Sequence, residues 1–479
     1  MGKSIRLFNL KSVIIGSGVL FISRNAFSYK PVKVIWLTNT PPDGYTNAAG
    51  TVNYVANDLY SSLYNKTVYP FLSSLFEVDG VKYVPVNPSE RTCDAIDCAY
   101  NESLEKINIG KTVSYKGVQM NVKNVNPYVC YDNNFIKDVD LSFDGNLGDN
   151  AFQRCTAMKT ATLGDGITSI GRYSFDGCNQ LENIVIPNTV TSLGNCAFGN
   201  CTSMTSAKIS CNVATIGSYA FSNCSALPKI EIPLSVEKID NYAFSGCKSL
   251  KEVIMTDRNA DDKALTLGSN GSSPLFADCP LDSVYIGRNI SYSTSSSDGY
   301  SPFYRNTSLR SVTITDKETE ISPNEFYGCT NLQNVQIGDG VTSIGDWAFS
   351  GCSSLNYFAF GSSVKTIGKE AFSDCTAMTR LISRAVTPPT CGSQALDDIN
   401  KWSCTLSVPT GATTAYQQAD QWKEFFFIDN NISGINKLMN TKAAPTHFYN
   451  LNGQKIQNTK PGLNIIKMSD GTTNKVIFK

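Results

Sequence analysis

The residue types that most often carry catalysis are scarce in this sequence. The chain of 479 residues contains one histidine, His447, which lies near its C-terminus. Nucleophilic sites of the Ser-His-Asp and Cys-His kinds need an imidazole base, and histidine is a common zinc ligand. The phosphate-loop, dinucleotide-binding and nucleophile-elbow motifs do not occur either. We therefore expect no enzyme activity, no metal and no cofactor.

Carboxylates offer one remaining route to chemistry, because a pair of them can hydrolyse glycosides. Asp257, Asp261 and Asp262 form the only acidic cluster near an irregular part of the sequence. A solvated acidic loop is the interpretation we favour. Lys and Arg number 41 and Asp and Glu also number 41, so no overall field attracts nucleic acid or an anionic membrane.

Phenylalanine and cysteine recur at a fixed interval through the middle of the chain. Phenylalanine returns every 23 residues from Phe152 to Phe244, and again from Phe303 to Phe372 after two longer steps. Nine of the 16 cysteines follow the same repeat, and an odd set cannot pair off completely in disulfides. Two other cysteine pairs are candidate disulfides, with free buried thiols as the alternative: Cys93 with Cys98, and Cys391 with Cys404.

The spacing inside each interval predicts a short strand and a shared core. Leu181, Ile184 and Ile186 recur at equivalent positions in neighbouring intervals, and the i, i+2 spacing of the last two is the period of a β-strand. A unit of 23 residues cannot bury its apolar side alone and becomes stable only when units stack. The predicted fold class is a repeat solenoid, a β-rich right-handed stack of about ten rungs.

The repeated phenylalanines and cysteines fit a buried ladder better than a functional site. An exposed aromatic stripe would bind ligands, but a fixed slot beside alanine in each rung is expected of a core. Metal sites need C-x-x-C or Cys/His spacing, whereas cysteine is often buried as a small apolar group. Repeated glycines such as Gly194 and Gly345 are expected to have positive φ. The predicted structural ladder contains Phe175, Phe198, Phe221, Phe244, Cys178, Cys201, Cys224 and Cys247.

The repeat unit resembles a known family. The pattern C-x-x-L-x-x-I-x-I-P-x-x-V-x-x-[IL]-G-x-x-A-F, which runs from Cys178 to Phe198, closely resembles the BspA-like leucine-rich repeats of bacterial surface proteins. The resemblance covers residues 76–428, including a hairpin at 76–83 and a closing segment at 404–425 that look like that family's N- and C-terminal caps. It implies a leucine-rich-repeat solenoid that takes part in adhesion or protein binding at a bacterial cell surface.

The N-terminus has the features of a signal peptide. Lys3, Arg6 and Lys11 precede an apolar run over residues 13–22, and Ala26 and Ser28 have the spacing of a cleavage site. The alternative is an uncleaved membrane anchor, but the run is shorter than the roughly 20 residues that span a bilayer. We therefore expect cleavage after Ser28 and no transmembrane span in the mature chain.

The C-terminal residues alternate strand-like runs with turn signals such as Asn452-Gly453. This tail resembles the sorting modules of proteins exported by the type IX route in Gram-negative bacteria. A small β appendage without a transport role is the alternative. The predicted domains are a signal peptide at 1–28, a region of unknown structure at 29–75, an irregular N-terminal cap at 76–150, the solenoid at 151–383, a C-terminal cap at 384–428, a linker at 429–445 and a small β module at 446–479.

The candidate ligand site lies where the 23-residue period fails. Two insertions, residues 256–275 and 291–302, follow strands in successive rungs, and the second combines Tyr, Ser and Gly, a mix suited to adaptable contacts. In the following rung, a glutamate replaces the usual apolar residue. The alternative is a pair of flexible loops that the fold tolerates. The hypothetical ligand patch contains Tyr285, Tyr292, Tyr300 and Glu318.

These features favour a binding protein over an enzyme. We expect a secreted or cell-surface leucine-rich-repeat protein that recognises an extracellular protein or glycan, at the outer surface of a Gram-negative bacterium. The alternative is a structural spacer of the cell envelope without a dedicated ligand, and a saccharide-processing enzyme is a distant third. The sequence predicts no oligomeric state.

Overall fold

The computed structural model describes residues 74–257, 263–268, 275–292 and 301–430 with their side chains, and the short strands nearer the two ends by backbone alone. The chain divides into two compact units. Unit 1 contains Met1–Leu250 and Thr266–Cys279, and unit 2 contains Lys251–Leu265 and Pro280–Lys479. Both units consist of β-solenoid rungs, about 12 in the described residues together. The predicted fold class is confirmed, and the expected ten rungs are close to this number.

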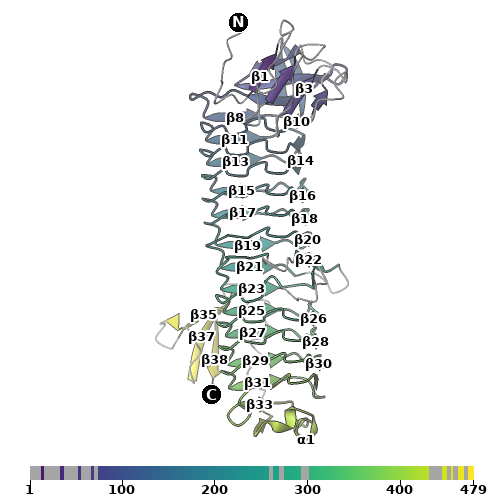
Figure 1. Ribbon diagram of the computed structural model, residues 1–479, viewed down its shortest axis with the longest axis vertical. Coiled ribbons are helices and arrows are strands. Elements are labelled where there is room, and N and C mark those ends of the chain that lie inside the picture. The colour runs from purple at the N-terminus through teal and green to yellow at the C-terminus, as the bar shows by residue number, and fades with distance from the viewer. Residues whose placement is uncertain are drawn as a thin grey trace, which may run out of the picture. The chain divides into compact units, whose positions relative to one another are not determined.

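One rung of unit 1 shows how the 23-residue repeat folds. β15 (Asn183–Val185) is followed by a turn and then by β16 (Ser192–Leu193). β15 pairs in parallel with β17 (Ser206–Lys208) of the next rung, in a register that advances by 23 residues. The central residue Ile184 is buried and its two neighbours are exposed, because successive strand residues face opposite sides of a sheet. Figure 1 shows β15 and β17 one above the other.

Unit 1 contains one long sheet. It begins with an antiparallel hairpin whose turn is Asp79-Gly80, which matches the hairpin expected at 76–83. A second antiparallel pair follows, and the sheet then continues as parallel strands. An antiparallel start gives the first parallel strands a partner and covers the core at that end. The strands of this sheet that belong to unit 1 are, in order, β5 (Phe76–Val78), β6 (Val81–Asn87), β7 (Thr92–Cys98), β10 (Val118–Val125), β12 (Gly145–Leu147), β14 (Ile167–Ile170), β16, β18 (Thr215–Ile216), β20 (Lys238–Ile239) and β22 (Leu265–Leu267), with β9 (Thr112–Tyr115) beside β10.

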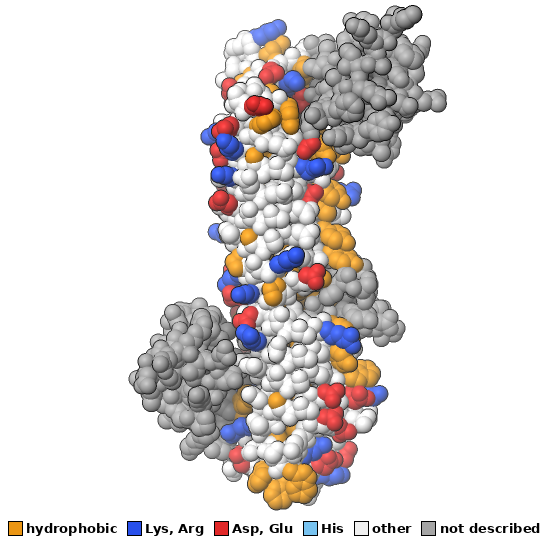
Figure 2. Space-filling view, turned by 60° about the vertical axis from the view of Figure 1, so that its left-hand side comes forward, with side chains coloured by type: hydrophobic (Ala, Val, Ile, Leu, Met, Phe, Trp, Pro, Cys, Tyr) orange, Lys and Arg blue, Asp and Glu red, His pale blue; other side chains and the backbone are white. Residues whose placement is uncertain are grey.

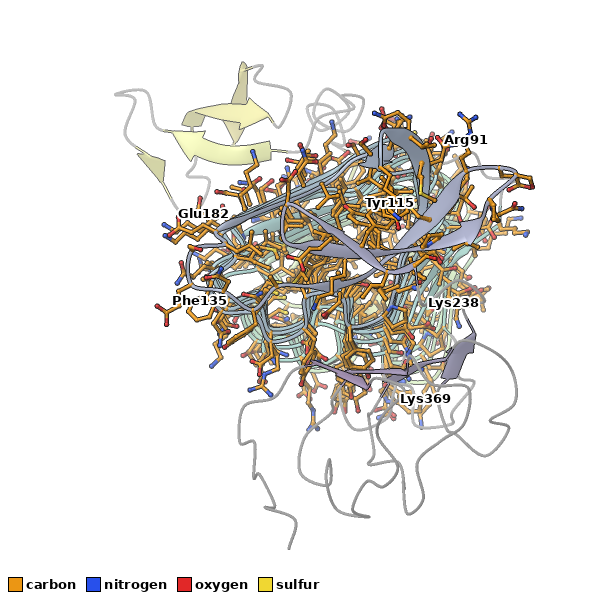
Figure 3. The ribbon with its side chains drawn as sticks, turned by 90° about the horizontal axis from the view of Figure 1, so that it is seen from above. Arg91, Tyr115, Phe135, Glu182, Lys238 and Lys369 are labelled. Carbon is orange, nitrogen blue, oxygen red and sulfur yellow. The ribbon has the colours of Figure 1, made fainter. Side chains whose placement is uncertain are left out.

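The other strands of unit 1 occupy a second side of each rung. They carry mostly polar side chains outward and aliphatic side chains inward. Seen from above, Glu182 and Lys238 project outward on opposite sides of the unit (Figure 3). These strands are β8 (Lys106–Ile109), β11 (Asp138–Leu141) and β13 (Thr160–Leu163) in one sheet, the pair β15 and β17, and β19 (Lys229–Ile232) in the next rung.

Unit 2 repeats the two-sided rung in two parallel sheets. Its core residues alternate along each strand as they do in unit 1. The longer sheet contains, in order, β21 (Glu252–Met255), β23 (Ser283–Ile286), β25 (Ser311–Ile314), β27 (Asn334–Ile337), β29 (Tyr357–Phe360), β31 (Arg380–Ser383), β33 (Thr405–Ser407) and β34 (Phe427–Asp429). The shorter sheet contains β26 (Glu320–Ile321), β28 (Ser343–Ile344), β30 (Thr366–Ile367) and β32 (Thr390–Cys391), and β24 (Ile290–Tyr292) precedes it.

A short helix and an aromatic cluster close the core of unit 2. Tyr416 of α1 (Thr413–Gln418) donates a hydrogen bond to the carbonyl of Ala385 at 2.8 Å. Trp422 of η2 (Trp422–Glu424) donates one to the carbonyl of Pro389 at 2.8 Å, and both rings are fully buried. These bonds satisfy backbone carbonyls at the end of the stack, so the segment acts as the expected C-terminal cap.

The phenylalanine ladder lies in the core of each unit. Phe175, Phe198, Phe221 and Phe244 have 0% exposed surface, and consecutive rings stack in parallel at 5.3–5.6 Å. Stacked rings at this separation exclude water along the whole row. Each phenylalanine therefore contributes both buried apolar area and contacts with its two neighbours.

Cysteines of the ladder donate weak hydrogen bonds to backbone carbonyls of the preceding rung. The buried Sγ of Cys178 donates to the carbonyl of Phe152 in the preceding rung at 3.2 Å, and Cys201, Cys224 and Cys247 repeat the contact. Burial raises the pKa of Cys224 to about 12. A buried thiol with a raised pKa is a poor nucleophile and a poor metal ligand, so these cysteines pack as small polar-tipped core residues.

The prediction of positive φ at the repeated glycines is wrong. Gly194 and its equivalents do not have positive φ. Nearby residues of the same turns do, among them Tyr173, Cys196, Tyr219 and Tyr242, with φ between 56° and 60°. Glycine is needed at 194 for another reason, since a Cβ there would lie 2.6 Å from the carbonyl carbon of Gly171 in the preceding rung. Close approach of stacked backbones, and not turn geometry, selects glycine at this slot.

Replacing Gly194 by alanine should destabilise unit 1 by about 1–3 kcal/mol, because backbone must move to admit the methyl group. Urea denaturation of the full chain, followed by circular dichroism, measures the loss. Gly110→Ala is the matched control, because the nearest atom to its added Cβ is 3.6 Å away. Equal stability of the two variants would show that rung spacing does not depend on glycine.

The ends of the chain contain two further small sheets. A parallel sheet contains β1 (Ser12–Ile15), β2 (Lys33–Trp36), β3 (Val52–Val55) and β4 (Lys66–Val68). The expected C-terminal β module is an antiparallel sheet of β35 (Pro445–Tyr449), β36 (Lys455–Ile456), β37 (Gly462–Met468) and β38 (Thr473–Phe478). Within the described residues, no helix has the length and apolar character to cross a membrane.

Candidate binding site

Tyr285 of β23 is paired with an acidic residue of the same unit. Its half-buried hydroxyl donates to the carboxylate of Asp257, with oxygen distances of 3.0 and 3.1 Å. Burial and the neighbouring Asp257 charge raise the pKa of the Tyr285 phenol. Among the three acidic residues singled out in the sequence, Asp257 is described, and Asp261 and Asp262 lie outside the described residues.

Tyr292 and Glu318 come together in a second group, which also includes Ser301 and Glu325. We call these four residues the acid cluster. Glu318 and Glu325 are each 4% exposed, which is rare for carboxyl groups. Ser322 donates its backbone N–H to Glu325 Oε2 at 2.7 Å, and the Ser301 hydroxyl donates to the carbonyl of Glu325 at 2.6 Å.

The surroundings of the acid cluster favour the protonated forms of its ionisable side chains. Burial raises the pKa of Glu318 to about 9, and the Glu325 charge adds to the effect. Burial likewise raises the pKa of Glu325 to about 7, although the N–H of Ser322 opposes it. Burial and the two carboxylates raise the pKa of Tyr292. At neutral pH the cluster therefore holds at least one acidic proton that isolated glutamates would have lost.

The described residues of the predicted ligand patch have different bonding partners. Tyr292 and Glu318 share the acid cluster, and Tyr285 has Asp257 as its partner instead. Tyr300 and most of the two insertions lie outside the described residues. Glu318 is buried and offers little surface to a ligand, whereas Tyr285 is half-buried.

The sequence analysis missed Glu325, although a signal for it exists. The residue before the ladder phenylalanine is alanine at Ala197, Ala220, Ala348 and Ala371, and it is glutamate before Phe326. Glu318 was noticed because it replaces an apolar residue, and the same comparison at this second slot would have identified its partner. Two acidic replacements seven residues apart in one rung mark the cluster.

Both predicted disulfides are wrong. The structure has free thiols at Cys93, Cys98, Cys391 and Cys404. Cys93 and Cys98 belong to one extended strand, β7, which separates residues five apart by roughly 16 Å. Cys391 ends β32 in the shorter sheet, and Cys404 directly precedes β33 in the longer one. The Cys93–Cys98 separation exceeds the Cα distance of about 4.4–6.8 Å that a disulfide requires.

The C-terminal cap exposes aromatic side chains that the sequence analysis did not single out. Trp402 is 75% exposed, Phe426 is 64% exposed and Phe427 is 51% exposed. The rings of Trp402 and Phe426 lie 5.4 Å apart, and those of Phe426 and Phe427 lie 4.9 Å apart. We call these three residues the cap patch. Figure 2 shows hydrophobic side chains gathered at the lower end of the molecule, where Figure 1 places the cap.

Outside the cap patch, the face shown in Figure 2 carries mixed charge and some further hydrophobic side chains. Figure 2 shows lysine, arginine and acidic side chains interspersed over the visible face, with no extended region of one sign. Within the described residues, no group of three or more histidine, cysteine, aspartate or glutamate side chains is placed to hold a metal ion. The cap patch is therefore the clearest departure from an ordinary soluble surface.

Stacked two-sided rungs with phenylalanine and cysteine ladders define a β-solenoid of the leucine-rich-repeat class. Residues 145–264 and 298–387 match the family described as the BspA type leucine rich repeat region, in 6 copies. Both matched stretches consist of repeats similar to those of that family. The match confirms the resemblance found in the sequence, and no match exists among curated proteins.

Several solved bacterial structures are similar to this chain at low identity. A leucine-rich repeat protein from Bacteroides ovatus is 21% identical, with 72% of this chain and 98% of that chain covered and a TM-score of 0.37. A leucine rich cell surface protein from Faecalibacterium prausnitzii is 17% identical, with 74% and 94% covered and a TM-score of 0.32. The pneumococcal vaccine antigen PcpA is 15% identical, with 71% and 94% covered and a TM-score of 0.35.

Proposed function

We propose that this protein is a non-catalytic binding protein that recognises an extracellular protein or glycan. The observation that carries the proposal is the cap patch, in which three aromatic side chains are more than half exposed and in contact with one another. Removing such a surface from water stabilises a complex, and tryptophan is among the residues most enriched in binding hot spots.

The position of the cap patch also suits recognition. Phe427 begins β34, which is the last strand of the longer sheet of unit 2. A last strand presents backbone donors and acceptors that a partner strand can use, while the adjacent rings supply apolar contact. Protein binding by this combination needs no residue with catalytic chemistry.

A non-catalytic role agrees with the chemistry of the described residues. Among the described carboxyl groups, those of Glu318 and Glu325 in the acid cluster have strongly raised pKa values, and both are buried. A substrate cannot reach a general acid that has 4% exposed surface unless the rung opens. Cys224 and Cys375 of the ladder are buried thiols, and burial raises the pKa of each.

We further propose that the protein acts outside the cell or on the outer surface of a Gram-negative bacterium. The basic and apolar N-terminal segment supports export, and the C-terminal β module, residues 446–479, supports sorting by the type IX route. The competing role is a spacer in the cell envelope. A spacer would self-associate or co-purify with envelope components and would show no saturable binding to a soluble partner.

Arrays of matrix proteins and glycans, probed with the purified chain from residue 29 onward, test the proposal. We expect saturable binding that weakens at least about tenfold in the double variant Trp402→Ala, Phe426→Ser, because a hot-spot aromatic contributes about 1.4 kcal/mol or more. Val185→Ser is the control, since it removes an apolar side chain that is 57% exposed on β15.

Two results would contradict this function. If the native chain binds nothing saturably, the spacer role is favoured. If the double variant binds as tightly as the native chain, the cap patch is not the binding surface. Circular dichroism of both variants shows whether they keep the native fold, so that a loss of binding is assigned to the surface and not to unfolding.

A further inference from the structure

Unit 2 buries two carboxyl groups at slots that the next rungs fill with apolar side chains. The parallel register pairs Ile321 with Ile344 and advances by 23 residues. Glu318 therefore occupies the slot of Val341, and Glu325 occupies the slot of Ala348. Val341 and Ala348 are fully buried, as a core slot requires. Placing an ionised carboxylate in such a slot is costly unless a cation or a proton neutralises it.

Hydrogen bonds tie the segment before β24 to the turn that carries Glu318. Thr319 donates its backbone N–H and its hydroxyl to Asn289 Oδ1, at 2.8 and 3.1 Å. Backbone N–H groups of Ile290, Thr319 and Glu320 also point to the Glu318 carboxyl. Within the described residues β26 pairs only with β28, so these contacts, and not a strand ladder, hold β24 against this turn.

Two oxygens of the acid cluster lack a satisfactory partner. Glu318 Oε2 and Tyr292 Oη are buried, and neither forms a hydrogen bond with good geometry in the described residues. The Tyr292 hydroxyl faces Ser301 and Glu325, and Glu318 adds its charge nearby. A proton on one carboxyl removes one of the two like charges that this buried site would otherwise hold.

We propose that Glu318, Glu325 and Tyr292 form a proton-dependent latch, which holds β24 against the following rung while the carboxyl pair keeps at least one proton and releases it when both carboxyls ionise. The titratable groups around the pair are the two glutamates themselves, Tyr292 from β24 and Glu320 from β26. Arg288, which is also buried, lies in the link between β23 and β24.

The pH range of the latch follows from the sign of the shifts. Both glutamates have a pKa above the ordinary value of 4.5, about 9 for Glu318 and about 7 for Glu325. A raised folded-state pKa means that the folded state holds the protons more tightly than the unfolded state does. The stabilisation is complete in acid and is lost as the pH rises through 7 and 9. Glu325 ionises first, near pH 7, and release, which needs both carboxyls ionised, is reached only near pH 9.

Hydrogen exchange measured by mass spectrometry on the full chain tests the latch. We follow peptides that cover residues 287–292 and 315–325 from about pH 6 to about pH 9, with labelling times scaled to the intrinsic exchange rate at each pH. Protection of these peptides should fall by about tenfold or more across this range, while peptides over β15 and β17 should keep theirs.

Three variants separate proton control from a merely structural role. Glu318→Val with Glu325→Ala installs the residues of the next rung and should give protection that does not change with pH. Glu318→Gln keeps the shape and a donor without the charge, so it should stay protected up to pH 9. Glu320→Gln removes an exposed charge that contributes least to the raised pKa of Glu325, so it should shift the pH dependence only slightly.

Other outcomes overturn the proposal. Protection that is constant with pH in the native chain would show that the carboxyl pair does not titrate as a latch. The same pH dependence in the Glu318→Val, Glu325→Ala variant would assign the effect to other groups. Restoration of full protection at high pH by millimolar calcium chloride, in the native chain alone, would show that a cation and not a proton neutralises the pair.

Discussion

The substitution Phe221→Ala is expected to lower the free energy of unfolding by about 3–5 kcal/mol, because it removes a buried ring and leaves a cavity between stacked neighbours. Phe221 has no exposed surface and stacks at 5.4 Å on Phe198 and at 5.6 Å on Phe244. The flanking rings belong to rigid rungs and cannot collapse into the space. Urea denaturation of the full chain, followed by circular dichroism, gives the midpoint and slope.

The control for this prediction is Phe427→Ala, which deletes the same atoms at a position that is 51% exposed. We expect it to change the free energy of unfolding by less than about 1 kcal/mol. A similar loss in both variants would mean that the ladder stacking adds nothing specific to the stability of unit 1. A change of slope would instead show that unfolding of the solenoid rungs has lost its cooperativity.

The stability of the native chain should fall as the pH rises from about 5 to about 9, by on the order of 7 kcal/mol from the acid cluster. Each pH unit between the unfolded and folded pKa of a carboxyl costs about 1.4 kcal/mol. The unfolded value is 4.5, and the folded values are about 9 for Glu318 and about 7 for Glu325. Denaturant titrations at several pH values measure the slope.

The double variant Glu318→Val, Glu325→Ala isolates this contribution. Its stability should exceed that of the native chain at pH 9, and the difference should shrink toward pH 5 as the native glutamates become protonated in both states. Buried acids replaced by well-packed apolar residues are often neutral or stabilising. A difference that is the same at all pH values would refute proton linkage at these two residues.

Periodicity alone predicted most of the rung. Leu181, Ile184 and Ile186 were assigned to the core from their spacing, and the structure buries all three to 2% or less. The register between β15 and β17 repeats the 23-residue interval of the sequence. This success has a simple cause, because a repeated unit has one way to bury its apolar side, which is to place it against the same residues of the next unit.

The errors lie in the turns and at the ends. Gly194 was expected to adopt positive φ, yet what restricts it is the backbone of Gly171 one rung away. Cys93 and Cys98 were paired from their closeness in sequence, although an extended strand separates them. In both cases the local sequence contains no information on what lies across the stack, so residue type alone could not identify the constraint.

The sequence by itself determined that this chain is a solenoid with phenylalanine and cysteine ladders, because identical slots 23 residues apart must coincide in space when rungs stack. Only the tertiary structure decided that Glu318 and Glu325 share one buried cluster with Tyr292 and that Trp402, Phe426 and Phe427 form one exposed patch. These contacts join turns and links whose lengths differ from rung to rung. The repeat in the sequence therefore does not predict where their side chains lie. Their positions depend on how successive rungs pack.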